Sequence, residues 1–177
     1  MCTGVRFADA AGNLYFGRNL DWCESYGEGV VITPRGASIP TQFLGSLSPE
    51  HACVGMGIVV GGVPCYFDCA NEAGLAIAGL NFPGYAQFAE APEEGAVNVA
   101  AYEFPLWVAA SFSTVAEVRE ALKGVVIVAK APSEGYGVAQ LHWLVGDGKE
   151  SIVIECQADG MHVYDDGLDV LTNQPPF

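Results

Sequence analysis

The sequence predicts an α+β protein in which antiparallel β-sheets pack against a short helical layer. Short apolar runs alternate with turn residues along most of the 177-residue chain. Helix-type patterns occur only between residues 104 and 124. The mean hydropathy is +0.29 and only 16% of the residues are charged, which is typical of a sheet covered on both faces and equally of half a domain separated from its other half. No repeat or linker interrupts the pattern, so we expect one domain.

The first half of the chain predicts a series of strands bounded by turn residues. These strands are the apolar runs Thr3–Ala8, Leu14–Leu20, Val30–Thr33, Cys53–Val60, Val63–Cys69 and Leu75–Asn81. The first two form a hairpin around the loop at residues 9–13. A Pro/Gly/Ser-rich loop extends from the third strand to Ser48.

The second half predicts two helices followed by a four-stranded meander. The first helix lies near Phe104–Ser111, where Pro105 is tolerated in the first turn. The second begins at Thr114, which forms a capping box with Glu117, and ends at Gly124, a typical C-terminal cap. The apolar face of the second helix contains Val115, Val118 and Leu122. The meander strands are Leu141–Val145, Ser151–Cys156, Met161–Tyr164 and Asp169–Thr172, with Asp-Gly turns at 147–148, 159–160 and 166–167.

The charge balance excludes several classes of partner. Acidic residues outnumber basic ones by 21 to 7, which gives a formal net charge of −14. Nucleic-acid binding needs clustered Lys and Arg, and no such cluster occurs.

The first ten residues contain Arg6 and Asp9 and lack the apolar segment of a signal peptide. The apolar runs are too short to span a bilayer, so we expect a soluble, cytoplasmic protein with neither nucleic acid nor membrane as a partner.

The six cysteines predict neither a disulfide framework nor a metal site. In a reducing compartment disulfides are improbable, and no CxxC or HxxxH spacing is present. Most of the cysteines fit the pattern of small buried hydrophobic residues, namely Cys53, Cys65, Cys69 and Cys156. We therefore expect no metal and no organic cofactor.

The start of the chain carries the strongest chemical signal. Removal of Met1 would leave Cys2 with both a thiol and a free α-amine, whose pKa is about 7.7–8.0. Such an amine can act as the general base for the thiol of its own residue, as in N-terminal nucleophile enzymes. Taken alone, an accidental cysteine at this position remains the alternative.

A second motif follows on the strand that pairs with the first. Arg18 and Asp21 lie three residues apart in Gly-Arg-Asn-Leu-Asp-Trp at 17–22, and the hairpin would carry both next to Cys2. The carboxylate could hold the α-ammonium, and the guanidinium could lower the pKa of the thiol and shape the pocket wall. The alternative is a surface ion pair, which contributes under about 1 kcal/mol.

Taken in order along the chain, these motifs closely resemble the choloylglycine hydrolases, the family of bile salt hydrolases and penicillin V acylases. The matching segments are residues 1–4, 16–22, 66–75, 78–85, 102–107, 142–143 and 171–175. The resemblance implies the αββα sandwich of N-terminal nucleophile hydrolases. Family members are nearly twice this length, so residues 1–177 would be the N-terminal part of a single domain and the sandwich would be truncated.

The resemblance also implies roles for individual residues. Cys2 would attack the amide carbonyl, with Arg18 and Asp21 assisting the nucleophile and its amine. Asn81 and Asn173 would donate hydrogen bonds around the developing oxyanion and the scissile amide; from local sequence alone both would be turn residues. The bile salt contacts would include Leu20, Met56 and Phe67, although core packing explains Met56 and Phe67 at least as well.

The identity of Asn81 favours one branch of the family, because penicillin V acylases typically have Tyr at this position. The expected substrates are therefore glycine- or taurine-conjugated bile acids. Members of the family commonly form homotetramers, so the resemblance also implies a homo-oligomer. Two alternatives stay open. One is a penicillin V or other N-acyl amidase that uses the same nucleophile. The other is an inactive fragment or bile acid-binding subunit that lacks the C-terminal half.

Overall fold

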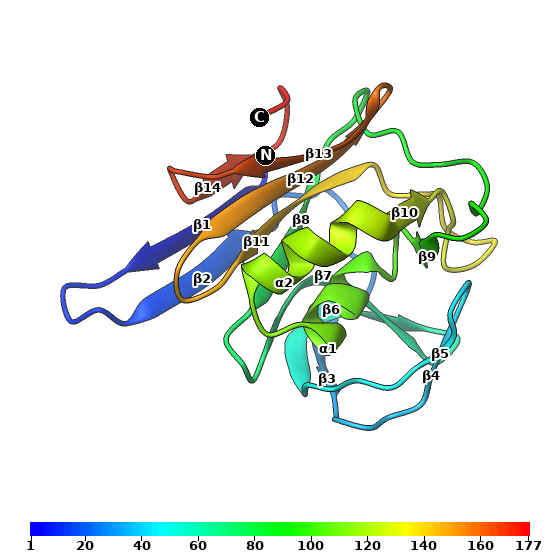
Figure 1. The fold of residues 1–177 in the computed structure, drawn as a ribbon, viewed down its shortest axis with the longest axis horizontal. Coiled ribbons are helices and arrows are strands. Elements are labelled where there is room, and N and C mark those ends of the chain that lie inside the picture. Colours follow the sequence, from blue (N-terminus) through cyan, green and yellow to red (C-terminus); the bar gives the residue numbers. More distant parts are fainter.

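A seven-stranded antiparallel sheet forms the centre of the structure, a computed structural model that describes residues 1–177 (Figure 1). The strand order is β13-β12-β11-β8-β7-β6-β3. The bounds are β3 (Gly29–Thr33), β6 (Cys53–Val60), β7 (Val63–Asn71), β8 (Ala76–Asn81), β11 (Leu141–Gly146), β12 (Ser151–Gln157) and β13 (Gly160–Asp165). The sequence located each of these strands to within two residues at either end.

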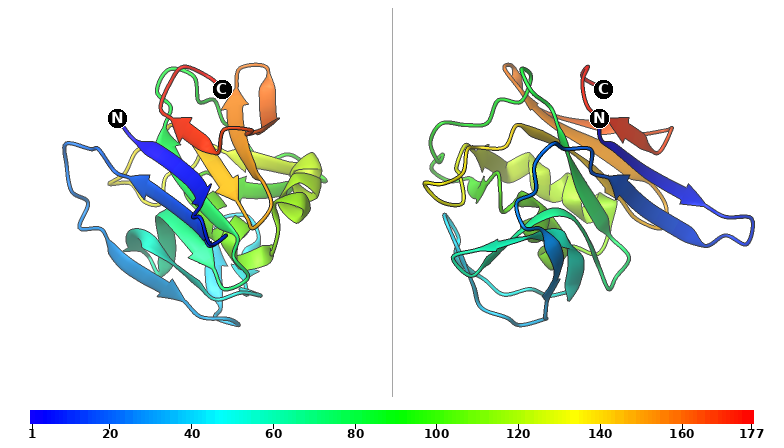
Figure 2. Two further views of the ribbon diagram at one scale, coloured as in Figure 1. Left: turned by 90° about the vertical axis from the view of Figure 1, so that its left-hand side faces the viewer. Right: turned by 180° about the vertical axis from the view of Figure 1, so that it is seen from behind.

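A three-stranded sheet packs on one face of the large sheet. Its order is β14-β1-β2, with β1 at Thr3–Ala8, β2 at Leu14–Asn19 and β14 at Val170–Thr172. Figure 2 shows the β1–β2 hairpin projecting beyond the large sheet. Between the sheets lies a small apolar cluster of Cys2, Ala78, Leu80, Leu144, Val153 and Leu171. Cys2 is therefore held in the interface between two sheets.

The predicted four-stranded meander is wrong in its last strand. β14 leaves the large sheet and pairs with β1 instead, with Thr172 opposite Thr3. The loop before it turns at Asp169, whose φ is 58°. The Asp169 carboxylate accepts two hydrogen bonds from Arg6 Nη1, at 3.0 and 2.9 Å. This side-chain contact joins the loop before β14 to β1, the strand with which β14 pairs.

The helices cover the opposite face of the large sheet. Helix α1 (Phe104–Ser111) has the predicted bounds, and nearly all of its side chains are buried in the main core. Helix α2 (Val115–Ala121) begins with the predicted capping box, in which the amide of Glu117 donates to Thr114 Oγ1 at 3.2 Å. The predicted cap at Gly124 is wrong, because the chain continues from α2 into a 3₁₀ turn, Leu122–Gly124, before β10.

Two strand pairs were missed in the sequence. Strands β4 (Ile39–Thr41) and β5 (Gly45–Leu47) form a small hairpin inside the predicted loop before Ser48. Strands β9 (Val97–Ala100) and β10 (Val125–Val128) pair in parallel. Each run is only three or four residues long, and a parallel pair joins segments that are distant in sequence. Local pattern therefore gives little signal for either pair.

The elements thus form three stacked layers, helices on the large sheet and the small sheet beyond it, which are three of the four layers of an αββα sandwich. The inter-sheet apolar contacts of the small sheet are with β8, β11 and β12. On β3 and β6, Val30, Ile32 and Val54 remain 71%, 70% and 48% exposed. This end of the large sheet has an apolar face in contact with solvent. None of the helices has the length and apolar character that a membrane span requires.

Replacing Gly55 by alanine should strongly destabilise the large sheet. A Cβ at Gly55 would lie 2.0 Å from the carbonyl oxygen of Asp68 and 2.5 Å from Cys69 Cβ, both on β7. Overpacking of this kind costs about 3 kcal/mol, which corresponds to a fall in Tm of roughly 6–12 °C for a chain of this size. Thermal unfolding followed by circular dichroism measures the effect. The control is Gly29→Ala on β3, where a Cβ meets nothing within 4 Å; an equal loss in both variants would contradict the prediction.

Candidate active site

Cys2 lies at the base of a small pocket where the two sheets meet. Its side chain belongs to the inter-sheet cluster, and the residue is only 3% exposed. The pocket has a volume of about 320 Å³, and it is lined by Met1, Cys2, Asp21, Trp22, Asn81, Asn173 and Gln174. The structure therefore brings together four of the five catalytic residues expected from the sequence, all except Arg18.

Asn173 makes the closest polar contact to the nucleophile. Its Oδ1 accepts a hydrogen bond from the backbone nitrogen of Cys2 at 2.5 Å. Its Nδ2 donates to the backbone carbonyl of Asn81 at 2.6 Å. Because Thr172 pairs with Thr3 across β14 and β1, Asn173 is carried next to Cys2. The residue is 7% exposed, so this amide is fixed in place from both ends.

Asn81 ends strand β8 on the other side of the pocket. Its backbone is held by Asn173 and by pairing with Leu141 on β11. Its side-chain amide makes no hydrogen bond within the chain, and the residue lines the pocket beside Cys2. A neutral amide in that place can donate to an oxygen that gains negative charge.

Asp21 holds the start of the chain. Its carboxylate forms an ion pair with the α-ammonium group of Met1. Asn19, which was not expected from the sequence, also binds this segment: its Oδ1 accepts from the amide of Thr3 at 2.7 Å and its Nδ2 donates to the carbonyl of Met1 at 3.3 Å. Its place between Arg18 and Asp21 in the motif was the available signal. Together these side chains fix residues 1–3 on both sides of Cys2.

Arg18 is buried and is not among the residues that line the pocket at Cys2. Its side chain is only 5% exposed, and Nη2 donates to the carbonyl of Gly79 at 2.7 Å. Its Nε lies 3.7 Å from Asp68 Oδ2 and has no hydrogen-bond partner. Burial raises the pKa of Asp68, and the positive charge of Arg18 opposes that rise. Both polar contacts of Arg18 are therefore to the large sheet, and neither is to the thiol.

None of the expected bile salt contacts lines the pocket at Cys2. Leu20 and Met56 are 41% and 37% exposed. Phe67 is the extra residue of a β-bulge opposite Met56 and Gly57 on β6, and its ring packs edge-on against Tyr26 at 6.1 Å. Bulges often redirect a side chain next to a functional site. All three residues therefore lie outside the lining of the pocket at Cys2.

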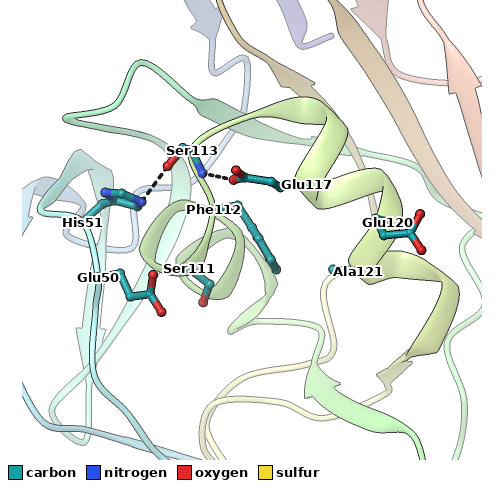
Figure 3. A pocket seen from close by; sticks show the side chains of 8 residues that line it. All are labelled: Glu50, His51, Ser111, Phe112, Ser113, Glu117, Glu120 and Ala121. Carbon is teal, nitrogen blue, oxygen red and sulfur yellow. Dashed lines mark hydrogen bonds between the residues drawn. The ribbon is translucent and has the colours of Figure 1, made fainter.

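A larger hollow of about 500 Å³ lies at the junction of the two helices (Figure 3). Here Ser113 Oγ and His51 Nε2 are 3.0 Å apart, and the amide of Ser113 donates to Glu117. Two further carboxylates, Glu50 and Glu120, line the hollow. Three carboxylates disfavour an anionic ligand, and the hollow contains none of the residues grouped around Cys2. Elsewhere in the chain, no cluster of His, Cys, Asp or Glu side chains is arranged to hold a metal ion.

Comparison of the sequence with known protein families shows to which family the chain belongs. The family model described as linear amide C-N hydrolases, choloylglycine hydrolase family, matches residues 2–177. The chain belongs to the choloylglycine hydrolase family. The match begins at Cys2, the residue that the sequence and the pocket both single out.

Curated choloylglycine hydrolases align with the whole chain. A bile salt hydrolase/transferase of Bifidobacterium longum subsp. longum is 58% identical, and the match covers 100% of this chain and 56% of that protein. A conjugated bile acid hydrolase of Lactobacillus gasseri is 53% identical with the same coverage. The chain therefore spans about half the length of the curated relatives it matches.

Solved structures confirm the N-terminal nucleophile hydrolase fold. A variant of conjugated bile acid hydrolase from Clostridium perfringens superposes with a TM-score of 0.95 at 38% identity, over 99% of this chain and 54% of that one. A penicillin V acylase from Agrobacterium tumefaciens gives a TM-score of 0.77 at 21% identity, over 99% of this chain and 53% of that one. The second likeness concerns the fold alone.

Proposed function

We propose that this chain carries the nucleophile and amide donors of a bile salt hydrolase, which cleaves the amide bond of glycine- or taurine-conjugated bile acids. The observation that carries the proposal is the convergence of Cys2, Asp21, Asn81 and Asn173 on one pocket. The relatives at 53–58% identity act on bile salts or conjugated bile acids by name. No comparable likeness favours penicillin V acylase over them.

The proposed reaction starts after Met1 has been removed. The α-amine of Cys2 takes the thiol proton, and the sulfur attacks the amide carbonyl carbon. The carbonyl oxygen becomes an oxyanion that the side-chain amide of Asn81 stabilises. The C–N bond then breaks as the α-ammonium returns its proton to the leaving nitrogen, which departs as glycine or taurine. Water, deprotonated by the same amine, hydrolyses the thioester and releases the free bile acid.

The surrounding residues keep the amine in place. Asp21, which holds the first α-ammonium in the present structure, would hold that of Cys2. Asn173 already accepts a hydrogen bond from the Cys2 nitrogen. Arg18 would act indirectly, through its contacts with Gly79 and Asp68 on the large sheet. We assign the sterol contacts to Leu20, Met56 and Phe67, because a rigid apolar ligand binds mainly through apolar side chains.

We also propose a cellular location and an oligomeric state for the protein. All six cysteines are free thiols, which supports a reducing, cytoplasmic location, since an active thiol must stay reduced. Exposed apolar side chains on β3 and β6 support association with further protein surface, and we propose the homotetramer typical of the family. Gel filtration at several concentrations tests that state; a monomer at all concentrations would contradict it.

The test combines intact mass with turnover of glycocholate. The mass establishes whether Met1 has been removed, and release of glycine is followed by mass spectrometry. The chain is assayed alone and after mixing with the unmatched C-terminal part of the Bifidobacterium longum relative. Release of glycine, with no release of phenoxyacetate from penicillin V, supports the proposal. Binding of cholate without release of glycine, both by the chain alone and by the mixture, would instead identify a noncatalytic bile acid-binding chain.

A further inference from the structure

Beneath the candidate site lies a buried polar pair that the proposed reaction does not use. His142 on β11 and Glu155 on β12 are both 0% exposed. His142 Nδ1 is 2.9 Å from Glu155 Oε1, and its Nε2 is 2.9 Å from the carbonyl oxygen of Thr172. The imidazole ring also stacks on Phe82 at 4.2 Å with an interplanar angle of 7°.

The partners of the imidazole define where hydrogen atoms must lie. The carbonyl of Thr172 only accepts, so Nε2 of His142 carries a hydrogen and donates it. The second hydrogen lies between Nδ1 and Glu155, whose carboxyl group also accepts from the amide of Phe177 at 3.1 Å and from Gln157 Nε2 at 2.9 Å. Burial lowers the pKa of His142, while its bonds to Glu155 and Thr172 oppose that change. With the hydrogen on either side, the pair is neutral overall and Nε2 remains a donor.

The two contacts of the ring fall directly beside the two amide side chains of the site. Thr172 precedes Asn173, and Phe82 follows Asn81. Asn173 in turn bridges the nitrogen of Cys2 and the carbonyl of Asn81. One rigid, fully buried ring thus touches both chain segments that hold the amides next to the nucleophile.

We propose that His142 and Glu155 are positioning residues, which fix the spacing of Asn81 and Asn173 and thereby the approach of both amides to Cys2. The decisive interaction is the hydrogen bond from Nε2 to Thr172, and Glu155 sets the hydrogen that makes it possible. This role rests on the proposed function, since it concerns the same pocket. An interaction that only stabilised the fold would change the free energy of unfolding, but at matched stability it would change neither kcat nor the reactivity of Cys2.

Two amide substitutions separate the two nitrogens. In His142→Gln the side-chain nitrogen lies near the former Nε2 and can still donate to Thr172. In His142→Asn it lies near the former Nδ1 and faces Glu155 only. Both variants lose the stacking on Phe82 equally. The control is Trp143→Phe, the adjacent residue, which is equally buried but faces the helices on the other side of the sheet.

Three quantities are measured on each variant: urea stability, kcat and KM for glycocholate, and the rate at which iodoacetamide alkylates Cys2. Alkylation is read from the mass of the N-terminal peptide, with the exposed Cys23 as internal reference. We expect His142→Asn to lower kcat about 100-fold, similar to loss of one oxyanion donor, with KM changed less than about threefold. His142→Gln should recover at least about tenfold of that loss, and Trp143→Phe should lose stability but keep kcat.

The alkylation measurement keeps the inference independent of turnover. If the unchanged protein releases no glycine, the proposed function fails, yet a difference in Cys2 alkylation between His142→Asn and His142→Gln still supports positioning. Equal alkylation rates and equal kcat values in the Asn and Gln variants would overturn it. The same holds if Trp143→Phe lowers kcat as much as His142→Asn at matched stability.

Discussion

Replacing Cys2 by serine should reduce glycine release from glycocholate by about a thousandfold or more, while the protein still folds. A serine hydroxyl has nearly the size of the thiol, so it fits the same place between the sheets. It is far less acidic than a thiol, and the α-amine, a weak base, is poorly matched to it. The Cys2 side chain otherwise makes only apolar contacts with the inter-sheet cluster, so the effect should fall on kcat and leave Tm nearly unchanged.

The matched control is Cys23→Ser, which replaces an exposed free cysteine near the same pocket. We expect this variant to retain its activity and to remain sensitive to iodoacetamide. The mechanism would be contradicted if Cys23→Ser lost glycine release while Cys2→Ser retained it. It would also be contradicted if a preparation that retains Met1 were fully active, because the amine of Cys2 would then be an amide.

Replacing Asn173 by alanine should lower kcat by about 100- to 1,000-fold, the effect of losing a preorganised donor or anchor at a reacting centre. The substitution removes the acceptor of the Cys2 nitrogen and the donor to the Asn81 carbonyl at once. It also leaves buried polar groups without partners, which costs about 1–3 kcal/mol of stability. Steady-state kinetics and urea unfolding on the same preparation separate the two effects.

Asn98→Ala provides a comparison of the same chemistry away from the site. Asn98 also bonds backbone groups on two sides, the amide and carbonyl of Glu93 and the carbonyl of Ala96. We expect it to lose stability without a change in kcat. If the two variants lost kcat in proportion to their stability, Asn173 would be a structural residue and its assignment to the reaction would be wrong.

Structural features that depend on residues close together in the chain could be predicted from the sequence. The β1–β2 hairpin, helix α1 and the capping box of Thr114 and Glu117 rest on local pattern, and all three are observed. The parallel pair β9–β10 and the transfer of β14 to the small sheet depend on contacts between distant segments. No local periodicity records such contacts, so these features could not be predicted from alternation of apolar residues.

Some residues of the candidate site could likewise be predicted from the sequence, and others could not. Cys2 could be identified from the chemistry of an N-terminal thiol, and Asp21 from its place in the hairpin. From local sequence alone Asn173 looks like a turn residue; the family resemblance singled it out, and the structure shows it bonded to Cys2. The depth of Arg18 could not be predicted, because it depends on the packing of one sheet on another. Asn19 was overlooked although it stands between Arg18 and Asp21 in the same motif, because a side chain that binds only backbone groups carries no reactive chemistry.

The bond between Cys2 and Asn173 also has a consequence for biosynthesis, since it joins residues 171 positions apart. At a translation rate of about 5–20 residues per second, roughly 10–30 s separate the synthesis of the two. During that interval β14 does not yet exist, and the first residues lack the partner that later encloses Cys2. An aminopeptidase that acts on nascent chains therefore meets an accessible Met1 well before the pocket forms. The pairing of β14 with β1 ends that interval by bringing Asn173 to the nitrogen of Cys2, and in the folded chain Cys2 is 3% exposed while Met1 is still 73% exposed.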